Sequence, residues 1–265
     1  MMHDATLTRL YGLAESGRNQ PIRAAIRDQQ ITTHEAYVKA AGWRELTASS
    51  VMREYAAACV AGLLGLPICV PFWVECPAPL LATSPDNGTT CLGDCDWPAF
   101  GSGFAGPQWR NWISTEAVHP EAKQMALSIF AFDAFIDNPD RRGPNPNLLV
   151  KGDQFRVIDH ELAFSFLDLL FPAPPPWVPG SLDWMTDGDR EHILYSVLKQ
   201  SAGLEFAEVH DSWAALNDAD IDTVIAGLPR SFSTVEPALG VALKRVKDVR
   251  DNIGDACIEL ERILT

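Results

Sequence analysis

The sequence predicts an α+β protein of two lobes, a small mixed N-terminal lobe and a larger, mainly helical C-terminal lobe. With 265 residues, the chain is long enough for two lobes that share a core. Hydrophobic residues make up 47% and charged residues 21%, which are globular values and exclude wholesale disorder. Strand patterns and one helix come first, then loops, then mostly helix with one hairpin. We therefore expect lobes at residues 1–76 and 77–265.

The N-terminal lobe is expected to begin with short strands. Residues 6–16 form a mixed apolar and polar opening segment. Residues 20–28 and 35–40 have the composition of two strands, with a turn near Gln29.

An uncharged stretch of twenty residues, 55–74, follows and is long enough to cross a bilayer. Pro67 and Pro71 lie in its second half, where they would break the continuous hydrogen bonding that a lipid-exposed helix requires. We therefore predict a buried helix over residues 48–64 and a buried strand over 68–74, with no contact to a membrane.

The C-terminal lobe is expected to begin with a connection, because residues 76–107 are rich in Pro, Gly, Asp, Ser and Thr. Residues 121–135 carry apolar side chains at helical spacing. Two apolar runs around Lys151-Gly-Asp-Gln154 predict a hairpin, and the five prolines of residues 171–180 predict irregular structure. The remaining helices are expected over residues 187–198, 218–228 and 237–264.

The charge balance argues against nucleic acid as a partner. Lys and Arg total 21 and Asp and Glu total 35, a formal net charge of −14 that repels phosphate backbones. The densest basic cluster, residues 244–250, is interrupted by Asp248 and is expected to be one face of a helix.

The six cysteines lack the spacing of a structural zinc site, since Cys91 and Cys95 form the only close pair. The N-terminus shows no basic region followed by an apolar stretch. We therefore expect reduced thiols and a cytoplasmic protein.

Oxygen-bearing side chains gather around the predicted hairpin. Asp140 lies on a proline-bounded turn, Asn145 and Asn147 precede the first strand, and Asp159 follows the second. A hairpin can bring an Asn and an Asp side by side, and Mg²⁺ prefers such oxygens together with substrate phosphates. A separate Asp can orient an attacking hydroxyl or accept its proton. The competing interpretation is that these residues only form turns, which Asp and Asn favour.

This stretch resembles the HipA-like kinase family, within the wider group of protein and phosphoinositide kinases. The matching motifs are Asn138-Pro-Asp-Arg141, Asn145-Pro-Asn-Leu-Leu149 and Ile158-Asp-His160. The resemblance implies a bilobal protein-kinase-like fold, with Asp140 as the catalytic residue and with Asn147 and Asp159 holding magnesium. In many kinases the magnesium Asn follows the catalytic Asp by five positions, which selects Asn145 as the alternative.

Kinases also need a strand lysine that touches phosphates and a helix glutamate that fixes it. Lys39 at the end of a predicted strand and Glu54 in the predicted helix look like these elements. Glu75 looks like the start of the hinge that meets adenine. Residues 15–20 occupy the expected phosphate-covering position with one glycine, Gly17.

A literal G-x-G-x-x-G at residues 101–106 follows Lys39 instead of preceding it. We interpret this stretch as a flexible loop.

The resemblance implies a kinase that uses ATP and Mg²⁺ to phosphorylate a hydroxyl group, with a Ser or Thr of a protein as the expected acceptor. A small-molecule kinase on the same fold is the first alternative. The second is a catalytically weak protein that binds a nucleotide. The long segment 76–107, with its Thr and Ser residues, favours the protein acceptor, because such segments often act as binding loops.

Overall fold

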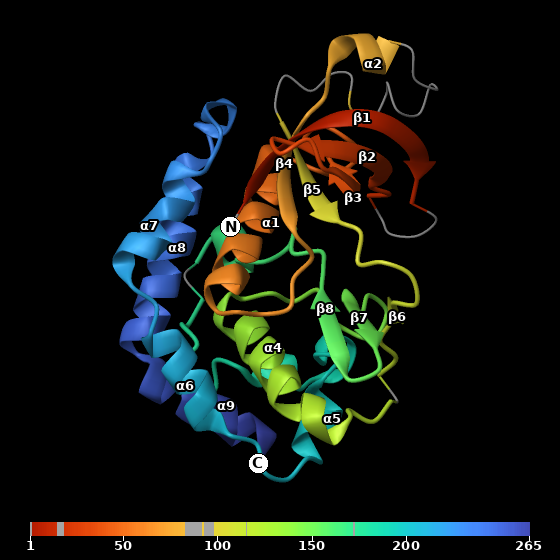
Figure 1. Ribbon diagram of the computed structural model, residues 1–265. Coiled ribbons are helices and arrows are strands. Elements are labelled where there is room, and N and C mark those ends of the chain that lie inside the picture. Colours follow the sequence, from red (N-terminus) through yellow and green to blue (C-terminus); the bar gives the residue numbers. More distant parts are fainter. Residues whose placement is uncertain (1, 15–18, 83–91, 93–97, 115, 172) are drawn as a thin grey trace.

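The computed structural model describes every residue except 1, 15–18, 83–91, 93–97, 115 and 172. Its N-terminal region is a closed barrel of five strands, in the order β1-β2-β3-β5-β4 (Figure 1). All neighbouring strands run antiparallel except β1 and β4, which are parallel. The strands are β1 (His3–Leu13), β2 (Ile22–Asp28), β3 (Thr33–Lys39), β4 (Pro71–Glu75) and β5 (Ala99–Gly103). The strands expected over residues 20–28 and 35–40 are confirmed, and the opening segment is also a strand.

The barrel closes around small and branched apolar side chains. Ala24 and Ile26 of β2 and Val38 of β3 are buried in it, whereas Arg23 on the other face of β2 is exposed. Because side chains alternate along a strand, Tyr37 and Lys39 point away from this interior. Lys39 is thereby directed toward the rest of the chain.

Strand β5 corrects the expectation of a loop across residues 76–107. Within that segment the structure has a short helix, α2 (Ala78–Ala82), and then β5, which pairs with both β3 and β4. The barrel thus extends beyond residue 76, and the glycine-rich run begins as a strand. Glycine disfavours strands in general, but here it is required by close packing. A Cβ on Gly101 would lie 2.8 Å from Cγ2 of Val74, and one on Gly103 3.2 Å from the carbonyl oxygen of Val70.

Replacing Gly101 by alanine should therefore destabilise the protein by about 1–3 kcal/mol, the usual cost of overpacking. The matched control is Gly240→Ala in helix α8 (Glu236–Asp251), where a Cβ meets nothing within 4 Å and alanine favours the helix. Urea denaturation of both variants checks the prediction. Equal stability of Gly101→Ala and the wild type would contradict the packing at β5.

The buried helix predicted over residues 48–64 is confirmed as α1 (Ala48–Leu63). Thr47 caps it, since its hydroxyl accepts a hydrogen bond from the backbone N–H of Ser50 at 3.1 Å. Most of the helix is buried, and the Tyr55 hydroxyl donates to the Val224 carbonyl at 2.6 Å. Across the residues that the structure describes, no helix is long and apolar enough to span a bilayer.

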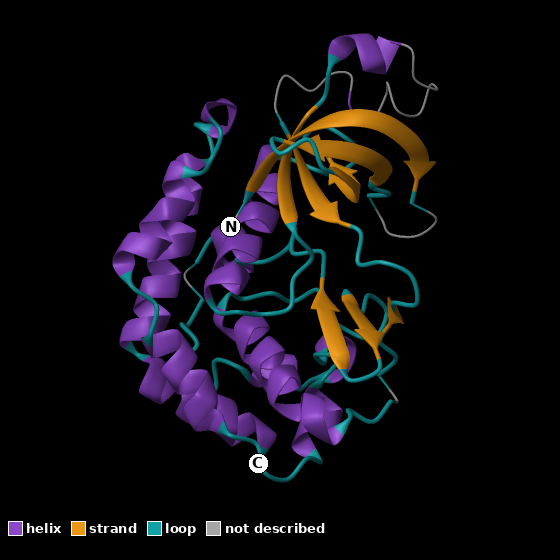
Figure 2. Cartoon of the chain, in the orientation of Figure 1, coloured by secondary structure: helices purple, strands orange, loops and turns teal. Residues whose placement is uncertain are grey.

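The C-terminal region is mainly helical and carries one small sheet (Figure 2). The sheet has the order β6-β7-β8, and its β7–β8 hairpin was predicted. Its strands are β6 (Arg110–Asn111), β7 (Leu148–Lys151) and β8 (Gln154–Val157). The main helices are α4 (Lys123–Phe135), α5 (Tyr195–Lys199), α6 (Phe206–Ala214), α7 (Asp218–Ala226), α8 and α9 (Ile253–Leu264).

Two helix predictions in this region need correction. The helix expected over residues 187–198 is reduced to a short 3-10 turn at Gly188–Arg190 and to α5. Between them, His192 forms a β-bridge with Arg142, so tertiary pairing replaces the helical hydrogen bonds. Helix α6 was not predicted. The predicted helix 237–264 is two helices, α8 and α9, which join at Asn252.

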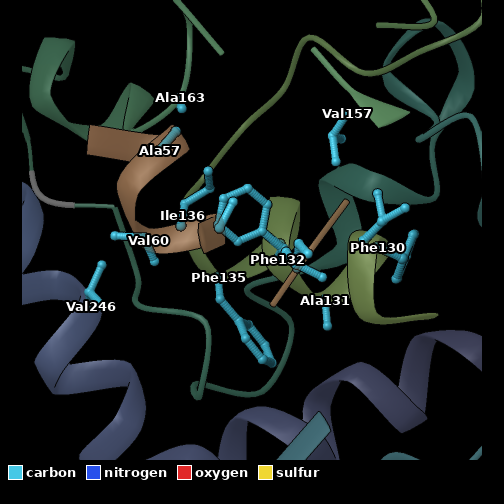
Figure 3. Packing of buried hydrophobic residues seen from close by; sticks show 14 of the residues in the cluster. Ala57, Val60, Phe130, Ala131, Phe132, Phe135, Ile136, Val157, Ala163 and Val246 are labelled. Carbon is cyan, nitrogen blue, oxygen red and sulfur yellow. The ribbon is translucent and has the colours of Figure 1, made fainter. Parts of the chain in front are cut away.

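One apolar core joins the two regions. Ala57 and Val60 of α1 pack with Phe132 and Phe135 of α4 and with Val246 of α8 (Figure 3). The helix that carries Glu54 is therefore held against the helical region by burial of apolar surface.

The basic cluster of residues 244–250 lies on α8, as predicted, and its charges are paired with acids. Lys244 contacts Asp248, Arg245 contacts Asp137, Lys247 contacts Asp222, and Arg250 contacts Asp218. These side chains brace the helix against its neighbours, in agreement with a structural function. The described cysteines, Cys59, Cys69, Cys76 and Cys257, are free thiols.

Candidate active site

A cleft with a volume of about 800 Å³ lies between the barrel and the β6-β7-β8 sheet. Lys39 lines it from the barrel. The connection after β5 lines it at Gly103–Gly106, and Asn145, Asn147 and Asp159 line it from the helical region. The cleft thus gathers most of the residues that the sequence singled out.

Lys39 is buried at the end of β3 and is surrounded by three carboxylates. Its Nζ donates to Glu54 Oε2 at 3.0 Å, to Asp159 Oδ1 at 2.6 Å and to Glu161 Oε2 at 3.0 Å. Burial alone would lower the pKa of Lys39, but the three carboxylates outweigh it and hold that pKa well above its ordinary value. The ammonium is the cation at the centre of this acidic cluster, so the cluster is neutralised in part without a metal ion.

Glu54 fixes Lys39 and also reaches the segment around Asp159. Its Oε2 accepts from Lys39 and from the backbone N–H of His160, each at 3.0 Å. Burial raises the pKa of Glu54 to about 7, against the opposing effect of Lys39. The helix α1, the barrel and the residues after β8 therefore meet at one carboxylate.

Asp140 lies on the turn before β7. Its Oδ2 accepts from Asn145 Nδ2 at 2.6 Å and from Asn147 Nδ2 at 3.0 Å. Burial, and then the neighbouring Asp159 charge, raise the pKa of Asp140 to about 6. At neutral pH it is therefore mostly a carboxylate, yet basic enough to accept a proton.

The residues Asn147 and Asp159 lie side by side across the hairpin. Nδ2 of Asn147 is 3.5 Å from the Asp159 carbonyl oxygen, and the backbone N–H of Ile158 donates to the Asn147 carbonyl at 3.2 Å. Both residues have left-handed backbone conformations, with φ of 44° and 59°. Asn and Asp tolerate this region better than most residues. Burial would raise the pKa of Asp159, but the adjacent Lys39 lowers it.

These side chains suit magnesium. Nδ2 of Asn147 is used for Asp140, which leaves the amide oxygen for a cation, and Asp159 is held ionised by Lys39. An amide oxygen and a carboxylate are the hard ligands that Mg²⁺ takes together with substrate phosphates. Asn145 donates to the same Asp140 oxygen but has no described contact with Asp159, so the geometry favours Asn147 over Asn145.

A buried ionic network supports the turn from beneath. Arg141 Nε donates to Asp133 Oδ2 at 2.5 Å, and its Nη1 donates to the carbonyls of Asn147 and Ile158. Arg141 and Asp133 are fully shielded from solvent. Because arginine can only donate, its contact at 3.0 Å makes Nε2 of His160 an acceptor. Burial, then Arg141, lower the pKa of His160 to about 3, so this histidine is neutral and packs beneath the site.

Glu75, which was predicted to bind the nucleotide, is not among the residues that line the cleft. Glu75 is exposed at the end of β4 and pairs with Thr6, whereas the antiparallel register of β4 and β5 places Gly103 at the opposite end of the barrel. The connection that lines the cleft follows β5, at Phe104–Trp109, because the barrel has one more strand than the sequence analysis recognised. Gly17 lies outside the described residues.

Three further residues belong to this site and were not predicted from the sequence. Glu161 contacts Lys39, Asn19 contacts Glu161 at 2.6 Å, and Asp133 anchors Arg141. The one available signal was Asp133, an acid in an otherwise apolar helix segment. Asn19 and Glu161 are 142 positions apart, and no local pattern links them.

A strand barrel with a buried Lys–Glu pair, joined to a helical region that carries Asp140, Asn147 and Asp159, is the arrangement of a kinase. Residues 12–167, more than half of the chain, match the HipA-like kinase family. The chain belongs to that family, and the resemblance stated from its motifs is confirmed.

A solved structure supports the fold. The crystal structure of the Helicobacter pylori proinflammatory kinase CtkA is similar, with a TM-score of 0.54 and 12% sequence identity over 97% of this chain and 98% of that chain. At this identity the likeness supports the fold: a strand-rich N-terminal region followed by a helical C-terminal region. Among curated protein sequences, none matches this chain.

Proposed function

We propose that this HipA-like kinase transfers the γ-phosphoryl group of ATP to a hydroxyl acceptor with the help of Mg²⁺, and that its two regions act as the two lobes of a bilobal kinase. One observation carries the proposal. One cleft holds a lysine that can bind phosphate and an Asn–Asp pair suited to magnesium, and the Asn of that pair donates a hydrogen bond to a separate carboxylate of raised pKa. A protein that only binds a nucleotide does not need that carboxylate.

The proposed roles follow from these positions. Lys39 binds phosphate oxygens, and Glu54 keeps its ammonium in place. Asn147 and Asp159 hold magnesium, which supplies neutralisation of phosphate charge. Asp140 orients the acceptor hydroxyl and accepts its proton as the new P–O bond forms, and ADP leaves with the electrons of the broken P–O bond. The base of the nucleotide is proposed to meet the connection at Phe104–Trp109, in place of Glu75.

We expect ATP to bind at full strength only in the presence of a divalent cation. Three carboxylates, those of Glu54, Asp159 and Glu161, surround the single ammonium of Lys39 in this part of the cleft. Without magnesium the nucleotide would meet a net negative charge. Calorimetry with a non-hydrolysable ATP analogue, with magnesium and with EDTA, measures this, and equal affinity in both conditions would count against the metal assignment.

A Ser or Thr of a protein remains the proposed acceptor, in a cytoplasmic setting. The support is the family membership, since the argument from residues 76–107 is weakened by the structure. Helix α2 and the start of β5 lie at the outer end of the barrel, away from the helical region (Figure 1). Of the hydroxyl residues in that segment, Ser102 is in β5, and Thr83, Ser84, Thr89 and Thr90 lie outside the described residues.

The acceptor class can be tested by intact-mass spectrometry after incubation with Mg–ATP, followed by labelling of a cell lysate. A mass increase of the protein, or labelled lysate proteins, is expected. ATP consumption only with a metabolite pool would establish the small-molecule alternative.

A further inference from the structure

The geometry points to Glu161 as a positioning residue that occupies Lys39 when no nucleotide is bound and must release it when phosphate enters. This inference rests on the proposed function, because it concerns how the same cleft accepts a polyphosphate. Glu161 lies two residues after Asp159 and was not among the residues predicted from the sequence.

All three protons of the Lys39 ammonium are used in hydrogen bonds. A lysine ammonium has three N–H donors, and Lys39 uses them for Glu54, Asp159 and Glu161 at 3.0, 2.6 and 3.0 Å. No N–H of Lys39 is left for a phosphate oxygen. A nucleotide can reach this lysine only if one carboxylate moves away.

The three carboxylates differ in how firmly they are held. Glu54 is buried and also accepts from the backbone of His160, so its release would leave a buried N–H without a partner. Asp159 is the carboxylate assigned to magnesium and faces the cleft whether or not it contacts Lys39. Glu161 has neither constraint, and its other oxygen is held by one side chain, Asn19. Glu161 is therefore the partner that yields.

Asn19 connects this exchange to the barrel. Its Nδ2 donates to Glu161 Oε1 at 2.6 Å. Its carbonyl oxygen accepts from Trp43 Nε1 at 2.9 Å, and its Oδ1 accepts from the backbone N–H of Glu45 at 3.3 Å. Asn19 is buried and lies in the turn that leads into β2. Departure of Glu161 would thus remove one of the three described hydrogen bonds that hold Asn19.

The charges around Lys39 also favour the release of Glu161 when phosphate binds. Three carboxylates around one ammonium leave two net negative charges where phosphate must bind. Replacing Glu161 by glutamine removes this repulsion, and replacing it by alanine also frees an N–H of Lys39. We expect Glu161→Gln to bind polyphosphate at least about tenfold more tightly than the wild type, equivalent to about 1.4 kcal/mol.

The test uses inorganic tripolyphosphate without metal, measured by calorimetry on the full chain. The variants are Glu161→Gln, Glu161→Asp and Glu161→Ala, with Glu121→Gln as the control. Glu121 is exposed on the 3-10 turn before α4, outside the cleft, and its substitution changes the net charge by the same amount. Glu161→Asp keeps the charge but draws the carboxylate back from Lys39, so its affinity should be intermediate. Circular dichroism verifies that each variant is folded.

Hydrogen exchange gives a second readout that does not depend on a ligand. In Glu161→Ala, Asn19 loses its partner, and the amide of Glu45 should exchange faster than in the wild type and in Glu121→Gln. Tighter tripolyphosphate binding by Glu161→Gln and Glu161→Ala, with no change in the control, supports the inference. Unchanged or weaker binding by Glu161→Gln overturns it, as does the absence of binding in every variant.

The same preparations separate this inference from the proposed function. If the wild type fails to bind the ATP analogue with magnesium while Glu161→Gln still binds tripolyphosphate more tightly, the kinase assignment fails and the role of Glu161 stands. If the wild type binds the Mg–ATP analogue and Glu161→Gln gains no affinity for tripolyphosphate, the role of Glu161 fails alone.

Discussion

Replacing Asp140 by asparagine or alanine is expected to lower phosphoryl-transfer turnover by about 10²–10⁴-fold, the range typical of a lost general base. Nucleotide affinity should change little in the asparagine variant, because Asp140 has no described contact with Lys39 and an asparagine side chain still offers an oxygen to Asn145 and Asn147. The asparagine variant keeps the shape of the side chain, so it separates loss of the carboxylate from disruption of the turn. Steady-state kinetics and calorimetry on the same preparations give both quantities.

Asp159→Ala is the comparison variant for this prediction. Asp159 contacts Lys39 and is the proposed magnesium ligand, so its loss should remove both turnover and metal-dependent nucleotide binding. The two aspartates therefore have different expected signatures, although both are acids of one cleft. Wild-type turnover in Asp140→Asn would show that the catalytic assignment is wrong.

Removing the charge of Arg141 should destabilise the protein by about 3–5 kcal/mol, because the buried Asp133 carboxylate would lose its cationic partner and keep only the contacts with Asn138 and His192. Burial alone would raise the pKa of Asp133, but Arg141 and His192 keep it below its ordinary value. Arg141→Met keeps most of the side-chain volume and loses every hydrogen bond to Asp133, Asn147 and Ile158. Chemical denaturation measures the change in the free energy of unfolding.

The double variant Asp133→Leu, Arg141→Met provides the control for this network. It removes both charges together, so it should recover part of the stability that Arg141→Met loses, although two carbonyls still lack their donor. A single variant as stable as the wild type would contradict the description of this pair as a buried ionic support.

The elements that the sequence predicted well are those with a local signal. Helix α1 was recognisable because Gly65 and Pro67 interrupt the uncharged segment 55–74, and the β7–β8 hairpin was recognisable from two apolar runs around a polar turn. Strand β5 was missed because two glycines suggest a loop. Its reason for glycine, contact with Val74 and Val70, exists only in the folded barrel.

In the candidate site, too, the residues with a local sequence signal were predicted and those without one were not. Asp140, Asn147 and Asp159 stand in short motifs. The structure places Asn147 and Asp159 in one cleft with Lys39 and Glu54, and Asp140 accepts a hydrogen bond from Asn147. Glu75 was chosen as the residue after the buried strand, which is the wrong strand end once β5 is counted. Glu161 and Asn19 could not be found from the sequence, since their contacts join distant positions through tertiary packing.

The most direct test of the central claim is incubation with γ-labelled ATP and magnesium, alone and with a cell lysate, for the wild type and Asp140→Asn in parallel. We predict that label is transferred to the protein itself or to an acceptor in the lysate by the wild type, and that the asparagine variant transfers far less at equal nucleotide occupancy. Equal transfer by the two proteins, or none by the wild type under any acceptor condition, would contradict the assignment of this cleft as the active site of a kinase.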